Sequence, residues 1–452
     1  MTQLQQYEIK ELTIQNQSIT YRAFQNVPYV RNIIDQEYQQ LNIFVPESFY
    51  QGESINGYTL KTAPVFMPNS VGGYMPGKLC EPGKKEWSDQ EEPNTIFCAL
   101  QHGYVVVAPA IRGRVLKAED GTNTGKAPAS IIDYKAAVRF LKYHRNELPG
   151  DMDKIITNGT SAGGALSSLM GATGNHPDYE EELNKLGAYE ATDDVFAASC
   201  YCPITNLDHA DMAYEWQFAG EYHAEWGGEM EEKLIQTSKE EAALFIPYLN
   251  SLQLKDEDGT LLSLDEGGNG SFKKYCCKKV IESAQKAVNK GIDLSNKNWL
   301  TIQNGRVIDM DFTKYIKDIT RMKKAPAFDA LTMESWENHV FGDALHEYAH
   351  FTEYSFTHSD VQEKNMADSL VIKMMNPLNY IKDTQAATTK HWRIRHGERD
   401  RDTSIAISAI VTLTLQMQGC EVDYHLPWDI PHAGDYDLEE LFAWIDSIVK
   451  AQ

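Results

Sequence analysis

The chain has 452 residues, of which 42% are hydrophobic and 10% aromatic, a composition typical of a globular protein with a well-buried interior. This length exceeds that of one ordinary core and indicates either a large domain with an insertion or two domains. The formal net charge of −23 argues against nucleic acid and anionic membranes as partners, because their phosphate groups would repel the chain.

The N-terminus and the cysteines indicate the compartment. Residues 1–10 lack a basic start followed by an apolar run, and no later window approaches the length of a membrane span. We therefore expect no signal peptide, no membrane contact and a cytoplasmic location. The seven cysteines form no regular framework, which predicts reduced thiols. Cys200 with Cys202, and Cys276 with Cys277, lack C-x-x-C spacing and a neighbouring histidine, so we predict no metal and no cofactor.

Strand-like and helical stretches alternate along the first two hundred residues. Residues 104–110 form a continuous apolar run, typical of a strand buried on both faces of a parallel sheet. Residues 130–145 carry apolar side chains at helical spacing and predict an amphipathic helix that packs on the sheet. Residues 155–158 and 196–200 predict two further strands. This alternation indicates a mostly parallel, doubly wound α/β core.

The alternation stops between residues 206 and 375, where charged helical stretches surround a loop or hairpin rich in Asp, Glu and Gly at 254–270. We interpret 206–375 as an inserted lid domain, and residues 1–205 with 376–452 as the core. The alternation then resumes with four predicted elements, a strand at 392–396, a helix at 403–418, a strand at 420–426 and a helix at 437–450.

Gly159-Thr160-Ser161-Ala162-Gly163 matches the G-x-S-x-G nucleophile elbow and stands between a β-prone run and a helical run of small residues. A serine hydroxyl is too weakly acidic to attack an ester unaided, so it must stand clear of the sheet beside a base and backbone N–H groups. The motif predicts an α/β-hydrolase fold in which Ser161 is the nucleophile.

In that fold the acid and the histidine follow the serine in chain order, on the loops after the last two core strands. Asp400 and His432 occupy those two loops, separated by one predicted helix and one predicted strand. Both loops should therefore return to the edge of the sheet that carries the serine. We predict His432 as the general base and then acid, and Asp400 as the carboxylate that orients it. Asp402 is the alternative to Asp400.

The oxyanion of the transition state needs backbone N–H donors. The first is predicted to be the N–H of Ala162, directly after the nucleophile, and the second to come from the loop after an early strand. Gly72 and Gly73 suit that loop, because glycine lets the backbone approach the substrate closely. The sequence does not decide between them.

Three stretches resemble the bacterial tannases, which are tannin acyl hydrolases and release gallic acid from galloyl esters. They are residues 159–167 (GTSAGGALS), 201–210 (YCPITNLDHA) and 396–402 (HGERDRD), and the resemblance extends over nearly the whole chain. It implies a serine esterase with a large lid, an acyl-enzyme intermediate and a small phenolic ester as substrate.

The resemblance also implies a set of substrate-binding residues. Lys323, Glu337 and Asp402 match the residues that hold the three gallate hydroxyls, and Ile204 matches one that packs on the galloyl ring. Trp336 stands where the family is expected to carry proline, so the contact with the ring should differ here. Because phenols donate hydrogen bonds, carboxylate acceptors suit them, and rings without hydroxyls should be rejected by roughly 1–3 kcal/mol for each unpaired group.

His346-Glu347-Tyr348-Ala349-His350 matches H-E-x-x-H, the helix signature of zinc peptidases. On a helix both imidazoles would share a face, and Glu347 could act as base for a metal-bound water. No third ligand follows at a familiar spacing, so zinc catalysis is a remote alternative and hydrogen-bonded lid residues are the simpler interpretation. The nearer alternatives are a feruloyl-type or general carboxylesterase on the same scaffold and, more distantly, a non-catalytic relative of this fold.

Overall fold

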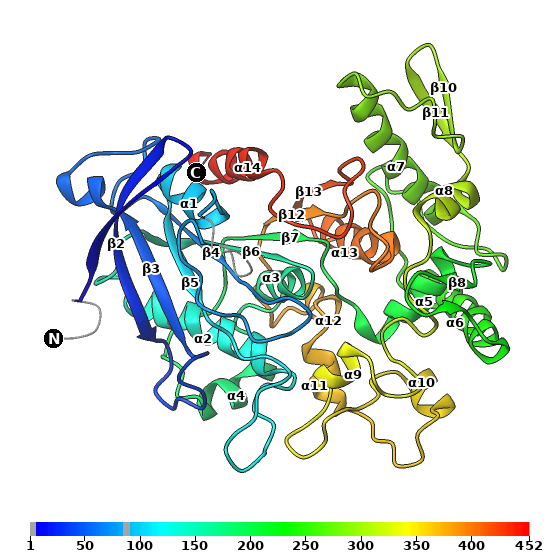
Figure 1. The fold of residues 1–452 in the computed structure, drawn as a ribbon, viewed down its shortest axis with the longest axis horizontal. Coiled ribbons are helices and arrows are strands. Elements are labelled where there is room, and N and C mark those ends of the chain that lie inside the picture. Colours follow the sequence, from blue (N-terminus) through cyan, green and yellow to red (C-terminus); the bar gives the residue numbers. More distant parts are fainter. Residues whose placement is uncertain (1–5, 85–90, 452) are drawn as a thin grey trace.

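The computed structural model describes residues 6–84 and 91–451, and its centre is a nine-stranded sheet (Figure 1). Across this sheet the order is β1-β2-β3-β5-β4-β6-β7-β12-β13. Its strands are β1 (Glu8–Ile14), β2 (Gln17–Pro28), β3 (Gln40–Pro46), β4 (Pro64–Pro68), β5 (Val105–Pro109), β6 (Asp151–Thr160), β7 (Ala197–Tyr201), β12 (His391–Arg395) and β13 (Glu421–His425).

The sheet is antiparallel from β1 to β5 and parallel from β5 to β13. All five residues of β5 and of β7 are buried, as expected for strands that are covered on both faces. Because the strands from β4 to β13 run in the same direction, the loops that follow them gather at one edge of the sheet. The predicted doubly wound α/β core is confirmed.

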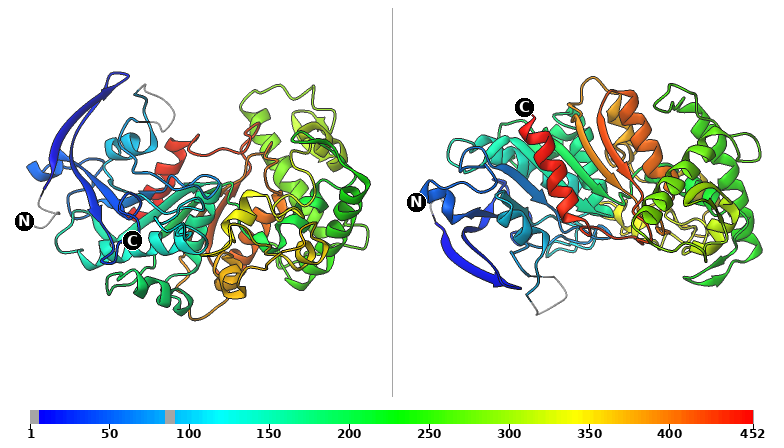
Figure 2. Two further views of the ribbon diagram at one scale, coloured as in Figure 1. Left: turned by 60° about the horizontal axis from the view of Figure 1, so that its bottom comes forward. Right: turned by 90° about the horizontal axis from the view of Figure 1, so that it is seen from above.

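Helices cover both faces of the sheet (Figures 1 and 2). On one side α1 packs beside α14, and on the other α3 packs with α2 and α12, while α12 also contacts α13. These helices are α1 (Thr95–Gln101), α2 (Ala129–Tyr143), α3 (Ala162–Ala172), α4 (Glu180–Lys185), α12 (Leu378–Ile381), α13 (Ile405–Met417) and α14 (Leu438–Lys450). The helices expected at 130–145, 403–418 and 437–450 are therefore present, with ends shifted by at most two residues.

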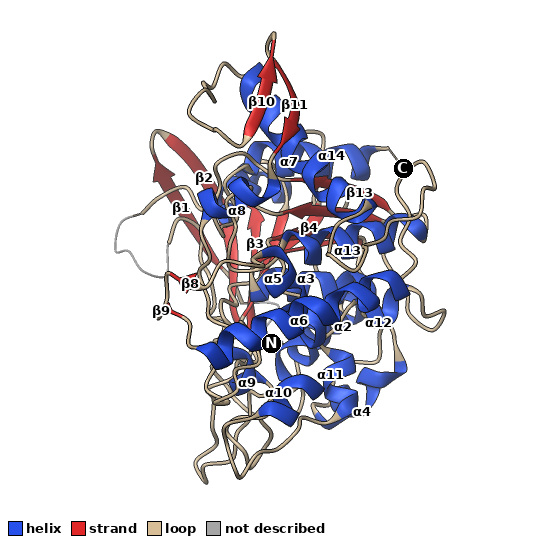
Figure 3. Cartoon of the chain, turned by 90° about the vertical axis from the view of Figure 1, so that its right-hand side faces the viewer, coloured by secondary structure: helices blue, strands red, loops and turns tan. Residues whose placement is uncertain are grey.

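Between β7 and β12 the chain leaves the sheet and builds the region at the right of Figure 1, which is mostly helix and loop in Figure 3. Most of its buried apolar side chains belong to the same hydrophobic cluster as those of the sheet, so this insert packs directly on the core. Ala284, Ala287, Leu294 and Val307 form a smaller cluster of their own. Its elements are α5 (Leu207–Gln217), β8 (His223–Ala224), β9 (Gly228–Glu229), α6 (Glu232–Ser251), α7 (Ser271–Asn289), β10 (Leu300–Gln303), β11 (Arg306–Met310), α8 (Phe312–Ile319), α9 (Trp336–Val340), α10 (Glu353–His358) and α11 (Ser369–Met374).

Membrane-spanning helices, the N-terminus and the cysteines bear on the expected compartment. Among the residues described, no helix combines the length and the apolar character needed to cross a bilayer. Residues 1–5, part of the stretch in which we expect no signal peptide, lie outside the described residues. The seven cysteines are free thiols, and Cys200, Cys202 and Cys276 are buried.

A buried carboxyl group, Glu241 on α6, lies inside the insert. Its side chain is 1% exposed, and within the described part of the chain neither carboxyl oxygen has a hydrogen-bond partner. Burial, together with the nearby carboxylates of Asp211, Glu215 and Asp329, raises the pKa of Glu241 to about 9. Glu241 is therefore protonated in the folded protein at neutral pH.

This burial predicts a pH-dependent effect of the substitution Glu241→Gln. Above its ordinary pKa of 4.5 the glutamate ionises in the unfolded chain but stays protonated in the folded one. The free energy of unfolding should therefore fall as pH rises through this interval, whereas glutamine titrates in neither state. We expect the stability of the variant relative to the wild type to increase by about 1 kcal/mol per pH unit from pH 5 to 8, measured by chemical unfolding. Parallel curves for the two proteins would mean that Glu241 is ionised when folded.

Candidate active site

Ser161 stands on a sharp turn between β6 and α3. Its backbone has φ 61° and ψ −121°, a conformation that costs a non-glycine residue about 1–3 kcal/mol. The Ser161 N–H donates to the carbonyl of Tyr201 at 3.0 Å, which ties the turn to the end of β7. A Cβ on Gly159 would lie 2.3 Å from the carbonyl oxygen of Gly163, and one on Gly163 would lie 2.5 Å from Asn69 Oδ1. Only glycine fits at either position, which explains why glycines flank the serine on both sides.

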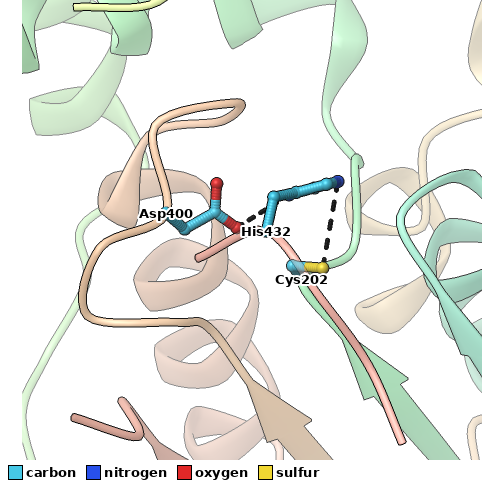
Figure 4. Close-up of side chains that lie close together, drawn as sticks. All are labelled: Cys202, Asp400 and His432. Atoms are coloured by element: carbon cyan, nitrogen blue, oxygen red, sulfur yellow. Dashed lines mark hydrogen bonds and ion pairs between the residues drawn. The ribbon is translucent and has the colours of Figure 1, made fainter. Parts of the chain in front are cut away.

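Asp400 and His432 lie together at the same edge of the sheet, on the loops after β12 and β13. His432 Nδ1 donates to Asp400 Oδ2 at 2.8 Å, and Asp400 is buried (Figure 4). Burial alone would raise the pKa of Asp400, but attraction to His432 and His396 and the hydrogen bond from His432 lower it to about 2. Burial alone would lower the pKa of His432, but Asp400 outweighs it and holds that pKa well above its ordinary value. The pair therefore favours a carboxylate beside an imidazolium.

The other imidazole nitrogen, Nε2, faces Cys202 (Figure 4). Nε2 lies 3.9 Å from Cys202 Sγ, and the thiol donates to the Ala433 carbonyl at 3.4 Å. In the described structure Ser161 Oγ and His432 are not hydrogen bonded, so the two side chains must come closer together before a proton can pass between them. Such contacts often tighten only when substrate is bound. The sequence predicts an ordinary thiol at Cys202, and nothing in its local pattern indicates that it contacts the histidine.

Asp402 does not contact His432 through a hydrogen bond in the described residues. Its backbone N–H donates to Asp400 Oδ1 at 2.9 Å, and its carboxylate pairs with Lys323 Nζ at 2.7 Å. Asp400 and Asp402 thus point to different partners, although only one residue separates them.

A cavity of about 200 Å³ opens beside Ser161. All the residues that the sequence analysis proposed for substrate binding line it, and so do Ala162 and Gly73. Gly72 is exposed and is not among the lining residues in the part of the chain described. A larger cavity of about 670 Å³ lies between α7 and the chain after β13, and Ser161 does not line it. The proposed substrate-binding residues, which line the smaller cavity, are Lys323, Glu337, Asp402, Ile204 and Trp336.

The polar residues of this cavity differ in how far they are already paired. Lys323 and Asp402 form an ion pair and are both largely buried. Glu337 is buried on α9, and within the described residues its side chain makes no hydrogen bond or ion pair. Burial raises the pKa of Glu337, and the charge of Lys323 partly offsets that rise. The cavity therefore presents an unpaired carboxyl group to a hydrogen-bond donor.

The H-E-x-x-H stretch is not helical, so its two histidines do not share a helix face. His346 bonds Asp343 at 2.8 Å and is exposed, whereas His350 is buried between Asp329 and Ser359. Glu347 pairs with Lys117 at 2.6 Å. The helical arrangement on which the zinc-peptidase alternative depended is therefore wrong, and these are hydrogen-bonded residues of the insert.

Sequence comparisons place parts of the chain among esterases. The family model BD-FAE matches residues 81–249. Esterase LipC of Mycobacterium tuberculosis is 41% identical over 56 residues, which is 12% of this chain and 14% of that protein. The probable carboxylic ester hydrolase LipM of the same organism is 47% identical over 53 residues, or 12% of each protein. The chain thus matches only a short part of these two relatives.

Solved structures match almost the whole chain. The tannin acyl hydrolase from Lactobacillus plantarum is 46% identical with a TM-score of 0.95, and the match covers 98% of this chain and 97% of that one. A tannin acyl hydrolase solved with ethyl gallate gives the same identity and coverage with a TM-score of 0.94. The Fusobacterium nucleatum tannase is 45% identical over 98% of both chains, with a TM-score of 0.94. With this identity over its whole length, the chain belongs to the bacterial tannases and is a carboxylic ester hydrolase with the α/β-hydrolase fold.

Proposed function

We propose that this protein hydrolyses esters of gallic acid through a Ser161–His432–Asp400 triad. The observation that carries the proposal is the cavity in which Ser161 meets Lys323, Glu337 and Asp402, residues that are far apart in the chain. Further support comes from relatives solved with ethyl gallate and with 3,4-dihydroxybenzoate. A feruloyl-type or general carboxylesterase is the second candidate, favoured by the BD-FAE match.

The reaction starts when Ser161 Oγ attacks the ester carbonyl carbon and passes its proton to His432 Nε2. Asp400 stabilises the imidazolium, and the N–H groups of Ala162 and Gly73 bind the developing oxyanion. Gly73 is preferred to Gly72 because it lines the cavity. The alcohol leaves with the proton from Nε2, and the acyl group stays on Ser161. Water then attacks with His432 as base and releases gallic acid.

Recognition of the acyl ring follows from the polar end of the cavity. The phenol groups donate hydrogen bonds, which Glu337 and Asp402 accept, while the Lys323 ammonium donates to a phenol oxygen. Ile204 supplies an apolar contact to the ring, and Trp336 lines the cavity wall. A ring without hydroxyls would leave buried polar groups unpaired, so it should bind much more weakly. In this proposal residues 206–375 act as the substrate-binding lid, because they supply Lys323, Glu337 and Trp336.

The experiment that tests the proposal compares three methyl esters, those of gallic, ferulic and benzoic acid. We expect kcat/KM to be at least about 100-fold higher for methyl gallate than for methyl benzoate, since two or more polar groups lose their partners. Methyl ferulate should fall between them. Equal values for gallate and ferulate would favour the feruloyl-type esterase and remove the role of the Lys323, Glu337 and Asp402 group.

A further inference from the structure

Two tryptophans at the active-site cavity leave about half of their surface in solvent. Trp226 is 50% exposed and Trp336 is 56% exposed, and both line the same cavity as Ser161. Of the tryptophans that the structure describes, only these two are exposed. An indole is one of the largest apolar surfaces a side chain can offer, so a pair of them beside a reactive serine indicates contact with a ligand.

The backbone of each tryptophan is held in place. The N–H of Trp226 donates to the Met322 carbonyl at 2.9 Å, which joins it to the segment that carries Lys323. Trp336 is the first residue of α9, directly after Ser335, which caps that helix through a reciprocal pair of hydrogen bonds with Asn338. Because hydrogen bonds hold the backbone at both sites, binding a ring there would cost little backbone conformational entropy.

The Trp336 indole lies against the loop that approaches the nucleophile. A Cβ on Gly73 would be 3.3 Å from Trp336 Cε3, so the ring packs on the glycine that we propose as an oxyanion donor. The Arg114 guanidinium lies 5.7 Å from the centroid of the same ring, and its Nε donates to the Gly73 carbonyl at 2.8 Å. Trp336 is therefore beside the reacting carbonyl as well as at the wall of the cavity.

The size of the cavity decides which part of a substrate can reach these indoles. Its volume of about 200 Å³ is below the roughly 300–1,000 Å³ of pockets that enclose whole ligands, and it suits a single ring. In the proposed mode of binding the hydroxyl end of the acyl ring meets Lys323, Glu337 and Asp402, which are largely buried. The ester oxygen must then point toward the open side, and the alcohol part must pass the exposed indoles.

We propose that Trp226 and Trp336 form a stacking subsite for an aromatic ring in the alcohol part of the substrate. The inference rests on the proposed function and extends it, because it assigns the residues that would contact the alcohol part of the substrate. An aromatic ring that stacks on an indole gains binding free energy beyond that of burying its apolar surface. A saturated group of similar size gains only the free energy of burial.

The test uses the full-length enzyme and three gallate esters with the methyl, benzyl and cyclohexylmethyl alcohols. Benzyl and cyclohexylmethyl groups are similar in size, and only the first is aromatic. The readout is the kcat/KM of benzyl gallate divided by that of methyl gallate within each protein. We expect Trp226→Ala and Trp336→Ala each to lower this ratio about tenfold, and Trp226→Phe to restore most of it. Tyr143→Ala removes an aromatic side chain of equal exposure on α2, outside the cavity, and should leave the ratio unchanged.

The outcomes separate this inference from the function on which it rests. An unchanged ratio in both tryptophan variants, with methyl gallate still cleaved by the wild type, would overturn the subsite alone. If the tryptophan variants lowered the kcat/KM of cyclohexylmethyl gallate, relative to methyl gallate, as much as that of benzyl gallate, the subsite would not require an aromatic ring, and that part of the proposal would be overturned. If the wild type did not cleave methyl gallate, the proposed function itself would fail.

Discussion

Replacing Ser161 with alanine should lower kcat/KM for gallate esters by about 10⁵-fold or more and leave the fold intact. Ser161 Oγ is the proposed attacking atom. Among the described residues Tyr74 and Ser335 also bring hydroxyls to the cavity, but neither stands on the turn after β6. Within the residues described, that oxygen makes no hydrogen bond, so its removal breaks none. Alanine keeps the Cβ and therefore the backbone conformation of the turn. The measurement is the release of gallic acid, together with the unfolding midpoint.

A neighbouring serine provides the control for this variant. Ser168 on α3 is buried and donates to the Gly164 carbonyl at 3.0 Å. Its replacement by alanine removes a hydroxyl from the same helix without touching the cavity, and activity should persist. If Ser161→Ala kept more than about 1% of wild-type turnover, another nucleophile would have to be sought.

Two substitutions on one loop should differ in how their effect depends on the ester. Asp400→Asn removes the charge that we propose to orient His432, and it should lower kcat on every ester by about 10⁴-fold. Asp402→Asn removes the partner of Lys323 and a proposed acceptor for a gallate hydroxyl. It should lower kcat/KM for methyl gallate about 100-fold, mainly through KM, and affect methyl benzoate far less. Steady-state kinetics of both variants on both esters measures the contrast.

The pH profile of the first variant gives a second readout. Asp400 raises the pKa of His432, so the wild type should gain activity as pH rises through that raised pKa and the neutral base appears. In Asp400→Asn this support is lost, and the acid limb of the residual activity should move to lower pH. If instead Asp402→Asn lost activity equally on all esters, Asp402 would be the residue that orients His432, and our choice of Asp400 would be wrong.

The amino-acid sequence alone determined the parts of this protein that depend on neighbouring residues. Continuous apolar runs and apolar side chains at helical spacing predicted the α/β core, because each strand or helix must bury the apolar side chains of its own segment. The glycine pattern around Ser161 also predicted the turn, although only part of the crowding is local: Gly159 would clash with Gly163, whereas Gly163 makes room for Asn69 in a distant segment. The resemblance to tannases supplied Lys323, Glu337 and Asp402, which no local pattern would have indicated.

Only the tertiary structure decided how distant loops meet. It placed Asp400 rather than Asp402 against His432, brought Cys202 to the imidazole, and set Trp226 beside the cavity. It also left the H-E-x-x-H stretch without a helix, because His350 is buried against Asp329 and Glu347 pairs with Lys117. These outcomes depend on packing between segments separated by tens to hundreds of residues. Periodicity and spacing report only on the segment in which they occur, so they carry no information about such contacts.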